Sequence, residues 1–113
     1  MTVFDRLELL ERLENDEEFL EELARMFLEE TPSTLAGLRE AVAAGDADEI
    51  RRLGHALKGA AANISGEELR EAALCAERAG AEGDAAQVVE MMPGIEAAMS
   101  RLIAALNEEL DAL

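Results

Sequence analysis

One local pattern recurs along this chain and constrains its fold more than any other feature. An oxygen-bearing side chain is followed three residues later by Glu or Gln, an arrangement that satisfies free amides in the first turn of a helix. The pattern occurs at Asn15…Glu18, Asp46…Glu49, Ser65…Glu68 and Asp84…Gln87. Thr31-Pro32 offers a fifth start, because threonine can cap a helix and proline suits its first position. The sequence therefore predicts a series of consecutive helices.

Glycines between these starts mark the turns, notably Gly45, Gly66 and the stretch from Gly80 to Gly83. Trp and Tyr are absent and Ala, Leu and Glu dominate, which is typical of close-packed helices rather than sheets. We expect helices over 3–13, 16–30, 32–44, 47–63, 66–79 and 85–111.

Within these segments the apolar residues recur at helical spacing, as they do where one face of a helix is buried. The expected inward-facing residues are Phe19, Leu23, Met26 and Phe27; Leu35, Leu38 and Val42; Leu69, Ala72, Ala73, Ala76 and Ala79; and Val88, Met92, Ile95, Met99, Leu102, Leu106, Leu110 and Leu113. The last stripe keeps its phase through Pro93, which predicts a bend or a break rather than a reversal. Short connections make neighbouring helices antiparallel. We therefore expect an all-α fold over residues 1–113, a single domain built as an antiparallel up-down four-helix bundle with an additional N-terminal helix.

The chain has 26 acidic and 10 basic side chains in 113 residues, a formal net charge of −16. Nucleic acids and anionic membranes bind dense positive surface, so neither is expected as a partner. No window is long and apolar enough to span a membrane, and no secretion signal opens the chain. The single Cys75 cannot form an internal disulfide, which suits a reducing compartment. We expect a cytoplasmic monomer that binds other proteins or cations.

His55 is the only histidine of the chain, and Lys58, three residues later, is the only lysine. At about 100° per residue, the apolar residues of this segment gather on one side of the helix: Ile50, Leu53, Leu57, Ala61 and Ile64. His55 lies about 150° from that stripe. The residues on the same outward sector are Asp48, Arg51, Arg52, Lys58, Gly59 and Ala62. The spacing predicts an exposed imidazole flanked by cations and by very small side chains.

The charges around His55 favour phosphoryl chemistry. Residues 51–58 hold three of the 10 basic residues and no acidic one, a positive patch that suits a transient anion. Lys and Arg stabilise phosphoryl oxygens by charge-assisted hydrogen bonds, and neutral imidazole is a competent nucleophile. Glycine inside a helix lowers helix stability by about 1 kcal/mol relative to alanine. The presence of Gly54 and Gly59 therefore requires a structural or functional explanation. We interpret Gly54 as a site of close helix packing and Gly59 as an opening through which a partner approaches the ring.

The run Leu53-Gly54-His55-Ala56-Leu57-Lys58-Gly59-Ala60-Ala61-Ala62-Asn63-Ile64 resembles the signature of histidine-containing phosphotransfer (HPt) domains, in which His-x-Leu-Lys-Gly is followed by small residues. The likeness in length, helix order and motif position extends from Phe4 to about Leu106. It implies an antiparallel four-helix bundle that serves a multistep phosphorelay. Such a domain accepts a phosphoryl group from an aspartyl phosphate of a response-regulator receiver domain and passes it to another receiver.

By this resemblance, His55 is the phosphoacceptor, through its outer ring nitrogen, and Lys58 stabilises the phosphoryl oxygens. The residues expected to contact the partner are Arg51, Arg52, Gly59 and Ala62. Such domains have no kinase activity, nucleotide site, metal or cofactor of their own, because the receiver supplies the aspartate and Mg²⁺. The chain departs from the family pattern at Ser65-Gly66, where glycine commonly comes first. We expect the turn to survive, with Ser65 as the cap of the next helix.

Three other readings stay open. A haem or metal site could use histidine and methionine. However, His55 faces away from the core, Met92 and Met99 are in phase with apolar neighbours, and one His with one Cys is too few for zinc. Cys75 is interpreted as a helix-packing residue. The chain could instead be a non-catalytic acidic adaptor that only docks receivers, or a module phosphorylated directly by a sensor histidine kinase. His55 and Lys58 together favour a phosphoryl carrier, and the absence of kinase domains favours a stand-alone shuttle or a module excised from a hybrid kinase.

Overall fold

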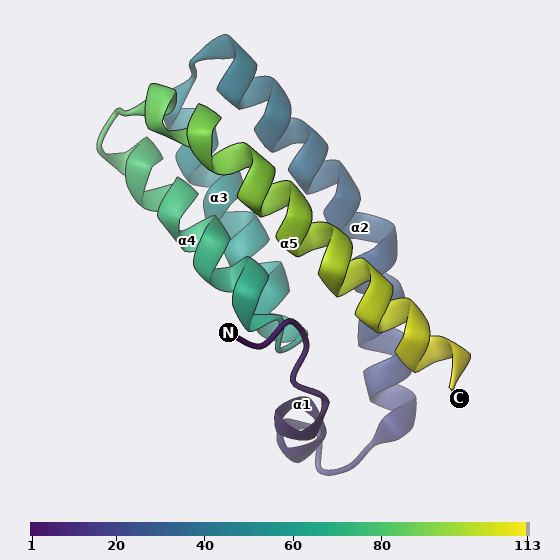
Figure 1. The fold of residues 1–113 in the computed structure, drawn as a ribbon. Helices are drawn as coiled ribbons and strands as arrows, with labels where there is room; N and C mark the ends of the chain where they lie inside the picture. Colours follow the sequence, from purple (N-terminus) through teal and green to yellow (C-terminus); the bar gives the residue numbers. More distant parts are fainter. Residues whose placement is uncertain (113) are drawn as a thin grey trace.

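The computed structural model describes residues 1–112, and it contains five helices joined by short turns (Figure 1). They are α1 (Arg6–Arg12), α2 (Glu17–Ala44), α3 (Ala47–Asn63), α4 (Glu67–Ala81) and α5 (Ala85–Asp111). No strand occurs among the described residues. The predicted all-α class is therefore confirmed, and the predicted bounds of the helices over 47–63 and 85–111 are correct.

The four long helices lie alongside one another, and consecutive ones run in opposite directions (Figure 1). Helix α2 packs against α3 and α5, and α4 packs against the same two helices from the other side. The result is an elongated body of 42 × 21 × 20 Å. The short helix α1 lies at the end of this body, beside the start of α2 (Figure 1).

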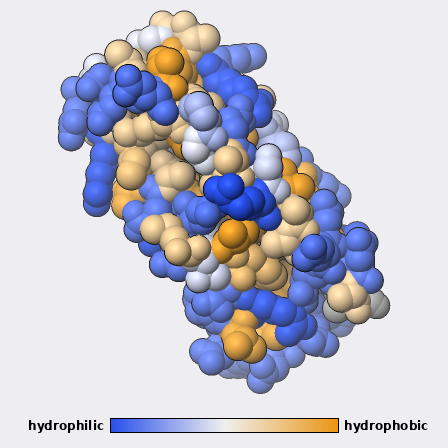
Figure 2. Space-filling view, in the orientation of Figure 1, coloured by the Kyte–Doolittle hydropathy of each residue, from blue (hydrophilic) through white to orange (hydrophobic). Residues whose placement is uncertain are grey.

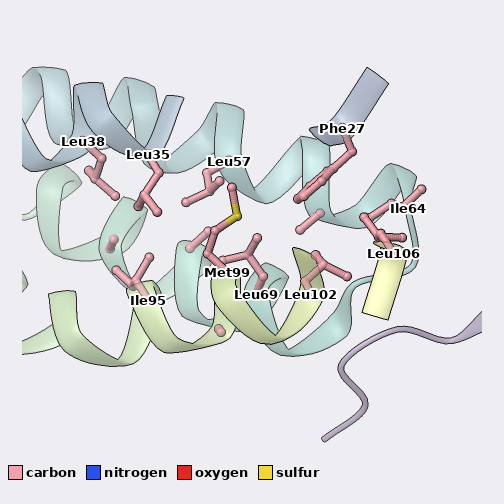
Figure 3. Close-up of a cluster of buried hydrophobic side chains, with 14 of the residues drawn as sticks. Phe27, Leu35, Leu38, Leu57, Ile64, Leu69, Ile95, Met99, Leu102 and Leu106 are labelled. Atoms are coloured by element: carbon pink, nitrogen blue, oxygen red, sulfur yellow. The ribbon is translucent and has the colours of Figure 1, made fainter. Parts of the chain in front are cut away.

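The core runs along the axis between these four helices (Figure 3). Helix α5 contributes a row of buried side chains that follows the predicted stripe, although Met92 and Leu110 are only partly buried. The labelled side chains that meet there are Phe27, Leu35 and Leu38 from α2, Leu57 from α3, Ile64 from the turn that follows, Leu69 from α4, and Ile95, Met99, Leu102 and Leu106 from α5. Leu113, the last residue of the predicted stripe, lies outside the described residues.

The N-terminal segment is hydrogen-bonded to the turn between α3 and α4. The amide of Asp5 donates to the carbonyl of Ser65 at 3.0 Å, and the amide of Glu68 donates to the carbonyl of Thr2 at 2.9 Å. Arg12 adds a contact from its Nη2 to Oγ of Ser65 at 2.6 Å. Residues 2–12 therefore hold the start of α4 from outside the bundle.

Two of the four predicted helix caps are correct and two are displaced by one residue. Asp46 and Asp84 cap α3 and α5 through their side chains, as predicted. The cap of α2 is Asp16 instead of Asn15, because Asn15 adopts a left-handed conformation with φ 64° in the turn out of α1. The cap of α4 is Gly66 instead of Ser65, because Ser65, at φ 56°, still belongs to the left-handed turn that ends α3.

The predicted helix start at Thr31-Pro32 is wrong, because α2 runs without interruption from Glu17 to Ala44. Proline removes one backbone hydrogen bond from a helix interior. Here Phe27 and Leu35, one turn before and one turn after this point, are both buried in the same core, and their packing keeps the two halves in line. Pro93 likewise lies inside α5, which is one uninterrupted helix. The chain does not reverse at Pro93, as predicted, and the break that was predicted as one alternative does not occur.

Several residues predicted to face inward are more exposed than expected. Phe19 and Met26 are half-exposed. For Phe19 the reason is that α3 ends at Asn63, beside Met26 and Phe27, about two turns of α2 short of Phe19. The interpretation of Cys75 as a packing residue is wrong, since its side chain is exposed. It falls just off the buried stripe of α4, one position before Ala76.

On the face formed by the N-terminal segment, α4 and α5, hydrophilic residues line most of the edges of the molecule, and residues of intermediate hydropathy lie at its upper end (Figure 2). Strongly hydrophobic residues are visible there only as small separate patches. Among residues 1–112, none of the helices has the length and apolarity needed to cross a membrane.

Candidate functional site

The site lies on α3, and its position follows from the way this helix buries one stripe. Ile50, Leu57 and Ala61 are fully buried, and they place the opposite side of the helix in solvent. His55 lies on that side, and 69% of its side chain is exposed. The predicted exposure of the imidazole is confirmed.

A carboxylate from the neighbouring helix joins His55 to Lys58. Nδ1 of His55 lies 2.7 Å from Oε2 of Glu77, and Nζ of Lys58 lies 2.7 Å from Oε1 of the same residue. The side chain of Glu77 is 18% exposed and that of Lys58 is 28% exposed. The two residues singled out in the sequence are thus brought together by a third residue, on α4.

The charge of Glu77 is set by these contacts. The ammonium of Lys58, 2.7 Å from Oε1, lowers the pKa of the Glu77 carboxyl below its ordinary value, partial burial opposes this, and the hydrogen bond with His55 contributes to the lowering. Glu77 is therefore an ionised acceptor at neutral pH.

An ionised acceptor at Nδ1 determines the tautomer of the neutral imidazole. A carboxylate only accepts hydrogen bonds, so Nδ1 of His55 must carry the hydrogen and donate it to Glu77. The other ring nitrogen, Nε2, then keeps its lone pair, on a ring that is largely exposed. In this tautomer the lone pair of Nε2 is available to act as a nucleophile.

The other predicted site residues surround His55 without joining this network. Arg51, Arg52 and Ala62 are exposed on α3, and Arg52 forms an ion pair with Glu49 one turn earlier. Gly59 is also exposed, and a Cβ placed on it would find no atom within 4 Å. Packing within this chain therefore does not require glycine at position 59.

At position 54, by contrast, the packing of α3 against α4 requires glycine, as predicted. Gly54 is buried, and a Cβ placed on it would lie 2.9 Å from the backbone nitrogen of Glu77. Helices α3 and α4 are therefore in backbone contact at the level of His55.

Glu77 was not anticipated from the sequence. It is one of 26 acidic residues, and nothing in its local pattern distinguishes it from the solvated glutamates of the other helices. The one available signal was indirect: the small residues of α4 and the buried Gly54 indicate that α4 approaches α3 closely, and the acid of α4 that faces α3 is then a candidate partner for His55 and Lys58.

The lowered pKa of Glu77 has a consequence for stability in acid. A carboxyl whose pKa is lower in the folded state stabilises that state above its ordinary pKa, and this contribution is lost as pH falls through the folded pKa. We expect the difference in unfolding free energy between the native chain and Glu77→Gln to shrink as pH is lowered from about 5 to about 3. Urea unfolding followed by circular dichroism measures it. A difference that stays constant over this range would show that Glu77 does not titrate with a lowered pKa.

Within residues 1–112, no group of three or more His, Cys, Asp or Glu side chains is placed to hold a metal ion. The network of His55, Lys58 and Glu77 consists instead of one nucleophilic nitrogen, one cation and one anion.

Comparisons with known proteins place this geometry in context. A crystal structure of histidine-containing phosphotransfer protein B from Pseudomonas aeruginosa PAO1 matches the fold with a TM-score of 0.90 and 21% sequence identity, over 98% of this chain and 96% of that chain. Comparison with curated protein sequences gives no match. The family model of the Hpt domain matches residues 22–113, which include most of α2 and all of α3 to α5. Since this segment is more than half of the sequence and contains His55, the chain belongs to the Hpt domain family.

Proposed function

We propose that this protein carries a phosphoryl group on Nε2 of His55, accepting it from the aspartyl phosphate of one receiver domain and passing it to another. The observation that supports this most directly is the exposed imidazole whose Nδ1 is held by Glu77 at 2.7 Å, with Lys58 on the same carboxylate. Membership in the Hpt domain family supports a role in a phosphorelay.

The proposed step needs no base in this chain. The lone pair of Nε2 attacks phosphorus, the bond between phosphorus and the aspartyl oxygen breaks, and the carboxylate leaves with the electron pair. The ring keeps its hydrogen on Nδ1 and becomes positively charged as the N–P bond forms. Glu77, already bonded to that nitrogen, balances the new charge, and the same steps in reverse order deliver the phosphoryl group to the second receiver. The receiver supplies Mg²⁺ and the aspartate.

Lys58 has a separate role in this proposal. Its ammonium contacts Glu77 in the unphosphorylated protein, and its three hydrogens let it bind phosphoryl oxygens while it stays near that carboxylate. A hydrogen bond to a charged group contributes about 1.5–3 kcal/mol. We expect Lys58→Ala to slow transfer roughly 10- to 100-fold, with receiver affinity nearly unchanged. Rapid-quench kinetics and titration calorimetry measure the two quantities, and an unchanged transfer rate would remove this role.

The receiver is proposed to dock over the part of α3 that carries few side-chain atoms. Gly59 and Ala62 follow His55 by one and two turns on its own side of the helix, both exposed, so a partner surface can come close to the ring. Arg51 and Arg52 lie before His55 and offer positive charge to an acidic partner.

Next to this face, a hollow of about 90 Å³ lies between α2 and the last turn of α3. The residues lining it are Leu23, Met26, Phe27, Glu30, Thr31, Ala60, Asn63 and Ile64. We assign it to an apolar side chain of the receiver, because most of its lining residues are apolar and one of them, Met26, is half-exposed.

The direct test is transfer of label. Receivers of the source organism are phosphorylated with a labelled donor, freed of the donor, and mixed singly with this protein. We expect label to appear on this protein from at least one receiver and to pass on to a second. The product should be labile in acid and stable in alkali, as phosphoramidates are. A protein that takes no label from any receiver contradicts the proposed function.

A further inference from the structure

Helices α3 and α4 are in backbone contact beside the site. A Cβ on Gly54 would lie 2.9 Å from the nitrogen and 3.1 Å from the Cα of Glu77. These atoms are backbone, which cannot move aside as the tip of a flexible side chain can. Glycine at position 54 is therefore a condition for the observed distance between the two helices.

A second glycine makes the reciprocal contact one turn away. A Cβ on Gly80 of α4 would lie 2.7 Å from the backbone nitrogen of Arg51 and 2.9 Å from the carbonyl oxygen of Ala47, both on α3. The same is not true of every helical glycine, since a Cβ on Gly94 would meet no atom within 4 Å. The two close contacts fix the distance between α3 and α4 at the level of His55 on α3 and Glu77 on α4.

The reach of the Glu77 side chain depends on this spacing. Its carboxylate contacts Nδ1 of His55 and Nζ of Lys58, each at 2.7 Å, from a backbone that is already in contact with α3. Hydrogen bonds weaken beyond about 3.2 Å between heavy atoms. If α4 moved outward by more than about 0.5 Å, a carboxylate in the same side-chain conformation would lie beyond this distance from both partners.

We propose that Gly54 is a positioning residue for phosphoryl transfer: by lacking a side chain, it brings the Glu77 carboxylate within hydrogen-bond reach of His55 and so fixes the tautomer of the ring. The inference rests on the proposed function only for its kinetic consequence. The tautomer of His55 is a property of the protein alone, and it can be observed without any partner.

The test is Gly54→Ala, read by ¹⁵N nuclear magnetic resonance of the histidine ring at a pH where the ring is neutral. His55 is the only histidine, so the spectrum contains one pair of ring nitrogens. We expect the native ring to carry its hydrogen on Nδ1, and the variant to shift toward the tautomer with hydrogen on Nε2. Gly94→Ala is the matched control, because it also adds a methyl group inside a helix, into open space, and it should leave the tautomer unchanged.

The kinetic consequence is tested by a double-mutant cycle. We expect Gly54→Ala to slow phosphorylation of His55 roughly tenfold, the loss of about one charge-assisted hydrogen bond. If Gly54 acts through Glu77, the double variant with Glu77→Gln is no slower than Glu77→Gln alone. Additive losses would overturn the inference, since Gly54 would then act by another route.

A second variant covers the case in which Gly54→Ala does not fold. Glu77→Asp withdraws the carboxylate by one methylene and leaves the contact of the two helices intact, so it should produce the same tautomer shift. An unchanged tautomer in folded Gly54→Ala or in Glu77→Asp overturns the inference. A tautomer shift in a protein that accepts no phosphoryl group supports the positioning role and contradicts the proposed function, so the two failures are distinguishable.

Discussion

His55→Gln is expected to reduce phosphorylation of this protein by any receiver to background. Glutamine offers no nucleophilic nitrogen, and no second histidine exists in the chain to take its place. The fold should be unaffected, because 69% of the replaced side chain is exposed and exposed substitutions change stability by about 0.5 kcal/mol or less. The measurement is labelled transfer from a phosphorylated receiver, together with circular dichroism to confirm that the variant is folded.

The matched control is Arg25→Gln, which changes an exposed residue of α2 whose ion pair, with Glu21, lies within that helix. It should be phosphorylated like the native chain. Titration calorimetry should show that His55→Gln still binds the receiver, since the proposed docking surface is intact. Undiminished labelling of the glutamine variant would place the phosphoryl group on another residue and contradict the proposed role of His55.

Leu102→Ala should lower the free energy of unfolding by about 2–5 kcal/mol, the usual loss for truncating a buried leucine. Leu102 is fully buried on α5 (Figure 3), and its Cδ2 lies only 2.7 Å from where a Cβ on Gly66 would be. A cavity there removes contacts that α5 makes with the start of α4. Because the chain has no Trp and no Tyr, urea unfolding is followed by circular dichroism rather than by intrinsic fluorescence.

Leu7→Ala provides the control for Leu102→Ala, because Leu7 is 73% exposed. The same truncation there should change stability by no more than about 0.5 kcal/mol. A loss below about 1 kcal/mol for Leu102→Ala would contradict the described packing of α5.

The features that could be predicted from the sequence are those that depend on neighbours along the chain. Asp46 and Asp84 cap their helices as expected, because a cap needs only its own first turn. The exposure of His55 followed from the apolar stripe of α3, since both lie on one rigid helix. Each of these predictions used residues within about two helical turns.

The features that could not be predicted depend on how distant segments meet. Glu77 is a site residue only because α4 approaches α3 at Gly54, a contact between positions 23 residues apart in the chain. The continuity of α2 through Pro32 arises because Phe27 and Leu35 share one core, which outweighs the local preference for a break. The spacing of Phe19 predicts a buried side chain, but α3 ends beside Met26 and Phe27 and does not cover it.

The contact between Thr2 and Glu68 has a practical implication for handling this protein. Gly66, at the start of α4, has no side chain with which to cap that helix, and the carbonyl of Thr2 accepts the amide of Glu68 in its place. Thr2 therefore caps α4 from a position more than 60 residues earlier in the chain. An affinity tag or a proteolytic cut near Thr2 would loosen the first turn of the helix that supplies Glu77, even though neither change comes near the imidazole.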